Sequence, residues 1–271
     1  MTHFFAATDM HVSLVAEPVF YVWGVAVTNS MILGALGTIV VLVLMFSVAR
    51  MAERGATNRF VGLFRWAFDS LYGQVTDIIT DRKLARSIAP LAITIFFFVL
   101  INYWLSILPG VGTITWDGVP VFRALVADLN FTFALAIITI VAVQLYAIKT
   151  MGLVANVKRY FHNPLRDPIG AFEGLLELVG EFSRALSLSF RLFGNAFAGE
   201  ILLLVAGLLT SYFATVALPI FMAFELFIGF IQAYVFFILT VIFTSLAQET
   251  HGAHDDDHST PELTHAEAKR E

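Results

Sequence analysis

The stretch ALSLSFRLFGNAFAGEILLL, residues 185–204, has the length and apolarity of a membrane-spanning helix but carries a charged residue near its middle. That residue is Arg191, whose guanidinium stays protonated at any physiological pH. Placing it at the bilayer centre costs between about 3 and more than 10 kcal/mol, depending on the scale. A chain keeps such a residue only where something compensates for this cost, so Arg191 is the first candidate functional residue.

The whole chain has the composition of an integral membrane protein. Of its 271 residues, 58% are hydrophobic and 14% are charged, whereas soluble domains carry about 25% charged residues. Cysteine is absent, which excludes disulfides and cysteine-based metal sites. No Lys or Arg precedes the first apolar stretch, so we do not expect a cleaved signal peptide.

Five apolar stretches reach or exceed the roughly 20 residues that a helix needs to cross the hydrocarbon. Helices are expected, because backbone groups in lipid must bond within the segment and no barrel-like alternation is visible. The predicted fold is an all-α integral membrane protein with an extracytoplasmic segment 1–26, a membrane domain 27–247 and a polar cytoplasmic tail 248–271. The predicted spans are 27–49, 88–108, 124–148, 185–209 and 213–247.

The basic residues predict how these spans are oriented. Seven Lys and Arg lie between the first two spans, one in the next loop, five in the loop after it and none between the last two spans. By the positive-inside rule, the N-terminus lies outside and the C-terminus in the cytoplasm. Arg191 is then the only basic residue within a span.

Two segments are not simple spans. Residues 59–81 carry an apolar stripe at helical spacing, which predicts a helix lying in the cytoplasmic interface; the alternative is a connecting helix packed on the spans. The tail is rich in His and Asp, but its spacing matches no structural zinc pattern, so we expect a disordered, solvated segment without a metal.

The fourth span is expected to be part of a longer helix. Glu177, Glu181, Arg184 and Arg191 recur at helical spacing on one face, and Glu181 and Arg184 are close enough to pair. A helix over 171–209 would be about 58 Å long, about twice the hydrocarbon thickness. It must tilt strongly or project well into the cytoplasm.

Helical geometry separates the polar side chains of the last two spans. Asn195 shares the face of Arg191, whereas Glu200 lies half a turn round the helix and about 13 Å along it, too far for a direct ion pair. Glu225 and Gln232 are seven residues apart and share a face of the last span. The small residues around Arg191 would let another helix approach closely in lipid.

The polar residues of the last two spans suggest that the protein moves ions. Arg191 itself cannot pass a proton on. A desolvated carboxyl can exchange protons near neutral pH, which favours a hydrated pathway at Glu200 and Glu225. A guanidinium cannot release its proton, so Arg191 can only attract a carboxylate or block a cation. No carrier lies near it in this chain, which argues for a partner subunit. The remaining polar groups, interpreted as hydrogen-bond partners between helices or groups at the outer interface, are Asn102, Asp128, Asn130 and Gln232.

The run from Ser187 to Glu200, with Gln232 in the last span, resembles subunit a of the rotary F-type ATP synthase. The Arg-Leu-Phe-Gly-Asn sequence is highly specific to that family. The resemblance extends more loosely from Asn102 through Asp128-Leu-Asn130 to the end of the chain, and the first hundred residues resemble the family mainly in hydropathy.

The resemblance implies a stator subunit whose tilted C-terminal helix hairpin packs against a ring of c subunits. Arg191 would face the ring carboxylate and separate two aqueous half-channels. The implied outer half-channel comprises Asn195, Glu200, Glu225 and Gln232, with Asn102, Asp128 and Asn130 as further candidates, and the cytoplasmic one Glu177 and Ser187.

The same resemblance implies a non-catalytic subunit of the bacterial inner membrane that needs no cofactor or metal. Its partners would be the c-subunit ring, the peripheral-stalk b subunits, the remainder of the ATP synthase and the lipid bilayer, with no nucleic acid. The chain has no phosphate-binding Gly-rich loop.

One departure from the family affects the outer carboxyls. Some members have His where this chain has Glu225, paired with Glu at the position of Glu200. Two neighbouring carboxyls would titrate as a coupled pair, so which one hands protons to the ring stays open. The alternatives from the residues alone are a self-contained ion-coupled transporter or channel and a structural or quinone-binding subunit of a respiratory complex.

Overall fold

The computed structural model describes residues 15–55, 58–108, 111, 114–116, 119–160, 168–210 and 214–249. Within these residues, five helices are long and apolar enough to cross a membrane, which confirms the predicted all-α integral membrane fold. The predicted disordered tail lies outside the described residues from position 250 onward.

The elements alternate long helices with short connections. The helices are α1 (Asn29–Glu53), α2 (Arg59–Ile78), α3 (Arg82–Ser106), α4 (Leu129–Met151), α5 (Leu153–Tyr160), α6 (Pro168–Thr210) and α7 (Ala214–Glu249), with the 3₁₀ turn η1 (Leu125–Ala127) before α4. Two short antiparallel hairpins, which were not predicted, are formed by β1 (Pro18–Val22) with β2 (Val25–Thr28) and by β4 (Thr115–Trp116) with β5 (Val119–Pro120).

Side-chain caps move two helix starts away from the predicted span edges. Asp81 accepts a hydrogen bond from the Lys83 N–H at 2.9 Å, so α3 begins at residue 82, before the predicted 88. Asp128 accepts from the Asn130 N–H at 3.0 Å, so α4 begins at residue 129, after the predicted 124. Hydropathy marks where the chain can enter lipid, whereas the capping carboxylates decide where each helix begins.

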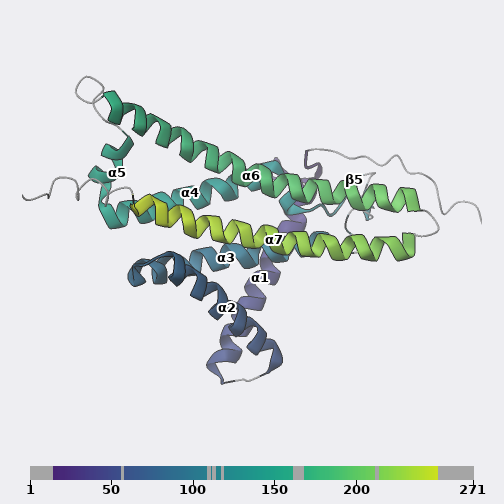
Figure 1. Ribbon diagram of the computed structural model, residues 1–271. Coiled ribbons are helices and arrows are strands. Elements are labelled where there is room, and N and C mark those ends of the chain that lie inside the picture. Colours follow the sequence, from purple (N-terminus) through teal and green to yellow (C-terminus); the bar gives the residue numbers. More distant parts are fainter. Residues whose placement is uncertain are drawn as a thin grey trace, which may run out of the picture.

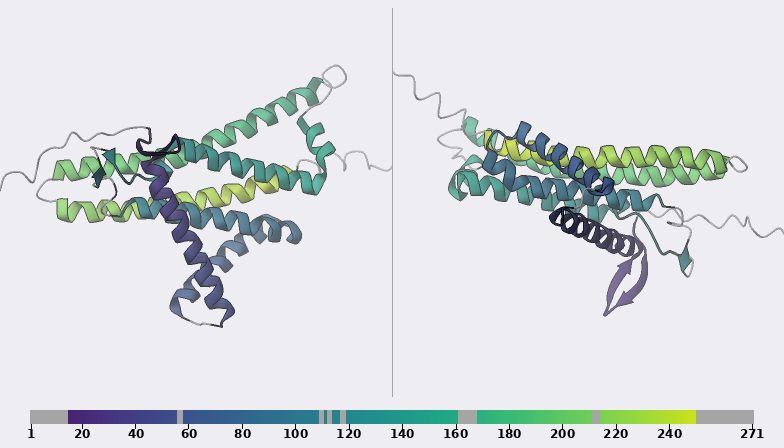
Figure 2. Two further views of the ribbon diagram at one scale, coloured as in Figure 1. Left: turned by 180° about the vertical axis from the view of Figure 1, so that it is seen from behind. Right: turned by 90° about the horizontal axis from the view of Figure 1, so that it is seen from below.

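The two longest helices form the predicted C-terminal hairpin. α6 and α7 run antiparallel, with α3 and α4 behind them, and α1 crosses these helices steeply (Figures 1 and 2). α6 has 43 residues, longer than the 171–209 expected. At 1.5 Å per residue it is about 64 Å long, about twice the hydrocarbon thickness. An α6 helix perpendicular to the membrane would therefore extend well beyond the hydrocarbon, and a helix that stays within it must tilt strongly.

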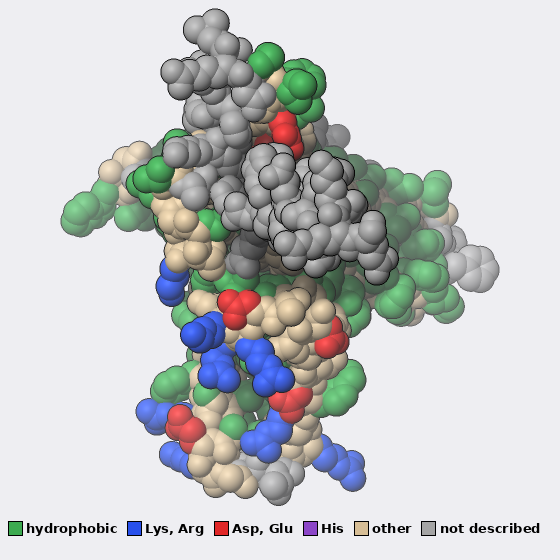
Figure 3. Space-filling view, turned by 60° about the vertical axis from the view of Figure 1, so that its left-hand side comes forward, with side chains coloured by type: hydrophobic (Ala, Val, Ile, Leu, Met, Phe, Trp, Pro, Cys, Tyr) green, Lys and Arg blue, Asp and Glu red, His purple; other side chains and the backbone are tan. Residues whose placement is uncertain are grey.

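α2 is the helix that the apolar stripe predicted, and its placement at the interface remains a prediction. It buries Val61, Leu71 and Val75 and packs mainly on α3. Lys and Arg side chains gather over the end of the molecule formed by α1 and α2 (Figure 3). This end contains the loop between the first two predicted spans, which carries seven Lys and Arg, more than any other loop.

The core lies between α3 and α7, which make the most extensive contact between helices. Tyr103 of α3 and Phe236 and Phe237 of α7 are almost fully buried there. The ring of Tyr103 occupies the space in which a Cβ at Gly229 would stand. Gly229 therefore sets the close approach of α7 to α3.

We expect Gly229→Ala to destabilise the protein by about 1–3 kcal/mol, because the added methyl overlaps the Tyr103 ring in a filled core. The thermal unfolding temperature in detergent measures this. Gly73→Ala is the matched control, since a Cβ there meets no atom within 4 Å and α2 should be unaffected or slightly stabilised. Equal unfolding temperatures for the two variants would contradict this account of the helix contact.

Candidate functional site

Arg191 lies on an exposed face of α6. Its guanidinium donates to Ser187 Oγ at 3.3 Å, and no carboxylate pairs with it among the described residues. Between residues 183 and 198, the exposed residues of this face besides Arg191 are small or polar, namely Ser183, Ser187, Gly194, Asn195 and Ala198. A charged group that protrudes from a stripe of small residues leaves room for another helix to pack over it.

A pocket of about 280 Å³ opens beside Arg191 between α6 and α7. Its lining residues are Ser183, Arg184, Ser187, Leu188, Arg191, Leu239 and Phe243. Arg184 donates to Glu181 at 3.2 Å, which confirms the predicted pair, and its guanidinium lies 5.4 Å from the centroid of the Phe243 ring. Ser187 thus joins Arg191 in one pocket, whereas Glu177, a half-buried residue nearer the start of α6, does not line it.

Asn195 and Gln232 bridge the two long helices. The Asn195 amide donates to Gln232 Oε1 at 2.6 Å. Gln232 is 2% exposed, and its Nε2 has no hydrogen-bond partner within the described part of the chain. The bridge joins the face that carries Arg191 to the interior of the hairpin, and it leaves one buried donor free.

Glu225 is held at the meeting point of α3, α6 and α7. Its Oε1 accepts a hydrogen bond from the Tyr103 hydroxyl at 2.6 Å, and the residue is 3% exposed. A Cβ at Gly199 would collide with the Glu225 carboxyl. Gly199 directly precedes Glu200, so the structure brings the two acidic residues to the same region of the helix pair.

Glu200 faces the loop that leads into η1. Its Oε1 accepts from the Ala124 N–H at 3.3 Å, and its Oε2 lies 4.0 Å from the Nε of Arg123. Its side chain is one third exposed, at 33%. Glu200 thus pairs with Arg123 and not with Arg191, as the half-turn offset along α6 requires.

Three other predicted residues have their described contacts with other parts of the bundle. Asp128 caps α4 and accepts from Ser30 Oγ of α1 at 2.7 Å. Asn102 donates to the Phe98 carbonyl of its own helix, and its side chain fills the space beside Gly37 of α1. Asn130 is exposed at the start of α4. The described contacts of Asp128 and Asn102 thus join α1 to α4 and α3.

Two residues of this site were missed by sequence reasoning. Arg123 was counted only as a loop charge and Tyr103 was not singled out, yet they contact Glu200 and Glu225 respectively. Arg123 is the single basic residue in its loop, which is a usable signal. Nothing in the spacing of Tyr103 distinguishes it from the other aromatic residues of its span.

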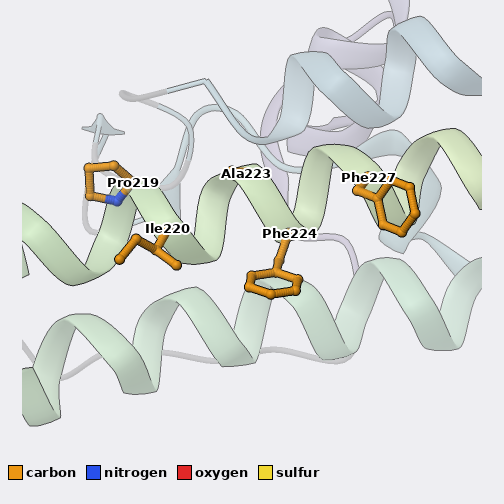
Figure 4. Close-up of a pocket in the computed structure, with 5 residues that line it drawn as sticks. All are labelled: Pro219, Ile220, Ala223, Phe224 and Phe227. Atoms are coloured by element: carbon orange, nitrogen blue, oxygen red, sulfur yellow. The ribbon is translucent and has the colours of Figure 1, made fainter.

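A second, shallower hollow of about 470 Å³ runs along the exposed side of α7. It is lined by Pro219, Ile220, Ala223, Phe224 and Phe227, whose side chains Figure 4 shows along that helix. None of these side chains can donate, accept or carry a proton. The chemistry therefore lies with the polar groups around Arg191, Glu200 and Glu225.

The amino-acid sequence is similar to those of known proteins. Residues 31–245 match the family described as the ATP synthase A chain. ATP synthase subunit a of Mycobacterium ulcerans is 34% identical over 231 residues, covering 84% of this chain and 89% of that protein. Subunit a of Mycobacterium leprae is 38% identical over 175 residues, covering 64% and 67%. Subunit a of Aliivibrio salmonicida is 32% identical over 220 residues, covering 78% and 80%. The chain therefore belongs to the ATP synthase A chain family, as a multi-pass membrane subunit of a rotary complex.

Proposed function

We propose that this subunit is the stator of the proton channel, and that Arg191 separates two aqueous half-channels at a rotor surface. The observation that carries the proposal is the position of Arg191. It lies exposed on a stripe of small residues, without a carboxylate partner among the described residues. A permanent cation in that position is suited to receive a carboxylate supplied by another subunit, namely the c-subunit ring.

The outer half-channel is proposed to follow the polar groups of the hairpin. Protons would reach Glu200 and Glu225, pass the Asn195–Gln232 bridge and protonate a ring carboxylate. This route is supported by the grouping of Glu225 against Gly199 and by the unpartnered Gln232 Nε2, a buried donor next to the exposed Asn195. Buried polar atoms without partners are places where water can complete the hydrogen bonding.

The cytoplasmic half-channel is proposed to use the pocket beside Arg191. Its volume of about 280 Å³ can hold several waters, and Ser183 and Ser187 supply hydroxyls that can donate or accept. Glu177 lies further along α6 towards its N-terminal end. A proton released from a ring carboxylate would leave by this pocket, so the carboxylate must rotate past Arg191 between uptake and release.

The membrane orientation and partners follow from the same proposal. The basic end formed by α1 and α2 would face the cytoplasm of a bacterial inner membrane, with the N-terminus outside (Figure 3). The peripheral-stalk b subunits would hold the chain against the ring. Rotation of the ring would couple proton flow to ATP synthesis in a catalytic head outside this chain.

The experiment that tests the proposal is co-purification followed by reconstitution. We expect the chain to co-purify with a ring of small hairpin proteins and to conduct protons into vesicles only when that ring is present. Proton transport by the purified chain alone would favour the self-contained transporter and overturn the stator proposal.

Removal of the Tyr103 hydroxyl tests whether its hydrogen bond to Glu225 contributes to the proposed outer half-channel. Tyr103→Phe keeps the buried ring but removes the donor to Glu225, so we expect proton flux to fall roughly fivefold, in line with about 1 kcal/mol for one hydrogen bond. Tyr234→Phe is the control, because its hydroxyl donates to Gln74 at 2.8 Å and bonds to no carboxyl of the described residues. Acidification of inverted vesicles measures both variants, and equal fluxes would argue against a role for the Tyr103 hydroxyl.

A further inference from the structure

Arg123 is a buried cation in the loop before η1, and the proton pathway proposed above leaves it without a role. The residue is 9% exposed. Its Nη1 donates to the Val15 carbonyl at 2.7 Å, while its Nη2 is buried without a hydrogen-bond partner in the described parts of the chain. Burying a guanidinium is costly, and a nearby carboxylate is the group best able to offset that cost.

Glu200 is that carboxylate. Arg123 faces its Oε2 with a separation of 4.0 Å, and the N–H of the next residue, Ala124, donates to its Oε1 at 3.3 Å. Arg123 and Ala124, two successive loop residues, thus each contact a different oxygen of the Glu200 carboxyl. A side chain held from both oxygens is restricted in rotation, although Glu200 is one third exposed.

The charged groups around Glu200 do not balance one another when both carboxyls are ionised. The loop contributes the Arg123 cation, α7 contributes Glu225 beside Gly199, and α3 contributes the neutral Tyr103 hydroxyl on Glu225. One permanent cation against two carboxyls leaves the group with one negative charge when both carboxyls are ionised. A single bound proton makes it neutral.

We infer that Arg123 is a positioning residue, which holds Glu200 towards the η1 loop. The pair formed by Glu200 and Glu225 then takes up and releases one proton at a time. The inference rests on the proposed function and adds to it a residue outside the membrane-spanning helices. Arg123 acts through Glu200 and has no proton of its own to give. Its charge, and not its bulk, is the property that matters.

The experiment is a double-mutant cycle on proton flux in inverted vesicles that hold the complete complex. The variants are Arg123→Gln, Glu200→Gln, the double variant and Arg123→Lys, with the exposed Arg86→Gln as the control. We expect Arg123→Gln to lower flux about tenfold, the scale of coupling between contacting groups. Arg123→Lys should recover most of the flux, and Arg86→Gln should match the unmodified protein.

The decisive comparison is made in the Glu200→Gln background. There Arg123→Gln should cause no further loss, because its target has already been neutralised. An unchanged proportional loss in that background, or a loss equally large in Arg123→Lys, would overturn the inference in favour of a packing role. The inference and the proposed function fail separately, since Arg191→Ala in the same vesicles tests the stator and leaves this pair intact.

Discussion

Arg191→Ala is expected to abolish proton-driven ATP synthesis while leaving the complex assembled. Arg191 is exposed on α6 and its single described hydrogen bond is to Ser187, so its loss removes no core packing. Without the cation, protons would pass between the two proposed half-channels without turning the rotor. Each charge that leaks through 100 mV wastes about 2.3 kcal/mol.

ATP synthesis in energised vesicles measures this loss, and co-purification of the c subunits measures assembly. Arg86→Ala is the matched control, because Arg86 is exposed near the start of α3 and lies outside the site. A normal rate of ATP synthesis by the Arg191→Ala protein would refute the stator proposal. Loss of the ring from the purified complex would instead assign Arg191 a structural role.

Glu225→Gln is expected to slow proton flux on the order of 100-fold, the scale on which general acid–base groups contribute. Glu225 is buried where three helices meet and receives the Tyr103 hydroxyl. Glutamine keeps the size and most hydrogen-bonding capacity of the side chain but cannot exchange a proton. Glu200→Gln is expected to act in the same direction with a smaller loss, because that side chain is more exposed.

Asn102→Ala is the comparison for both carboxyl variants. Asn102 is as buried as Glu225, but its side chain bonds to its own helix and packs beside Gly37. Its removal should weaken the contact with α1 and leave the flux through assembled complexes nearly unchanged. Equal losses for Asn102→Ala and the carboxyl variants in vesicle acidification would contradict the pathway.

The helices and the relative directions of side chains on α6 could be predicted because both depend on local rules. Hydropathy located all five spans, and the 3.6-residue period placed Glu200 away from Arg191. The caps at Asp81 and Asp128 moved helix starts, since a single short side chain outweighs a gradual change in hydropathy.

The contacts between distant segments could not be predicted from the same rules. The pairs Arg123 with Glu200 and Tyr103 with Glu225 join residues 77 and 122 positions apart, and no periodicity links them. Asn102 and Asp128 were named as further candidates for the outer half-channel through the family resemblance, and only Asp128 was placed by its depth, near the outer end of its span. In the structure both side chains contact α1, and neither the resemblance nor depth in the membrane specifies that direction around the helix axis.

The position of α7 between α6 and α3 has a mechanical consequence. α7 contacts both of these helices extensively, and α6 also rests on α4. Close-packed protein interiors have low compressibility and transmit strain. If a rotor turns against the Arg191 face of α6, as proposed, its lateral push would be carried through α7 into α3, and the buried aromatic residues between those helices would resist the torque.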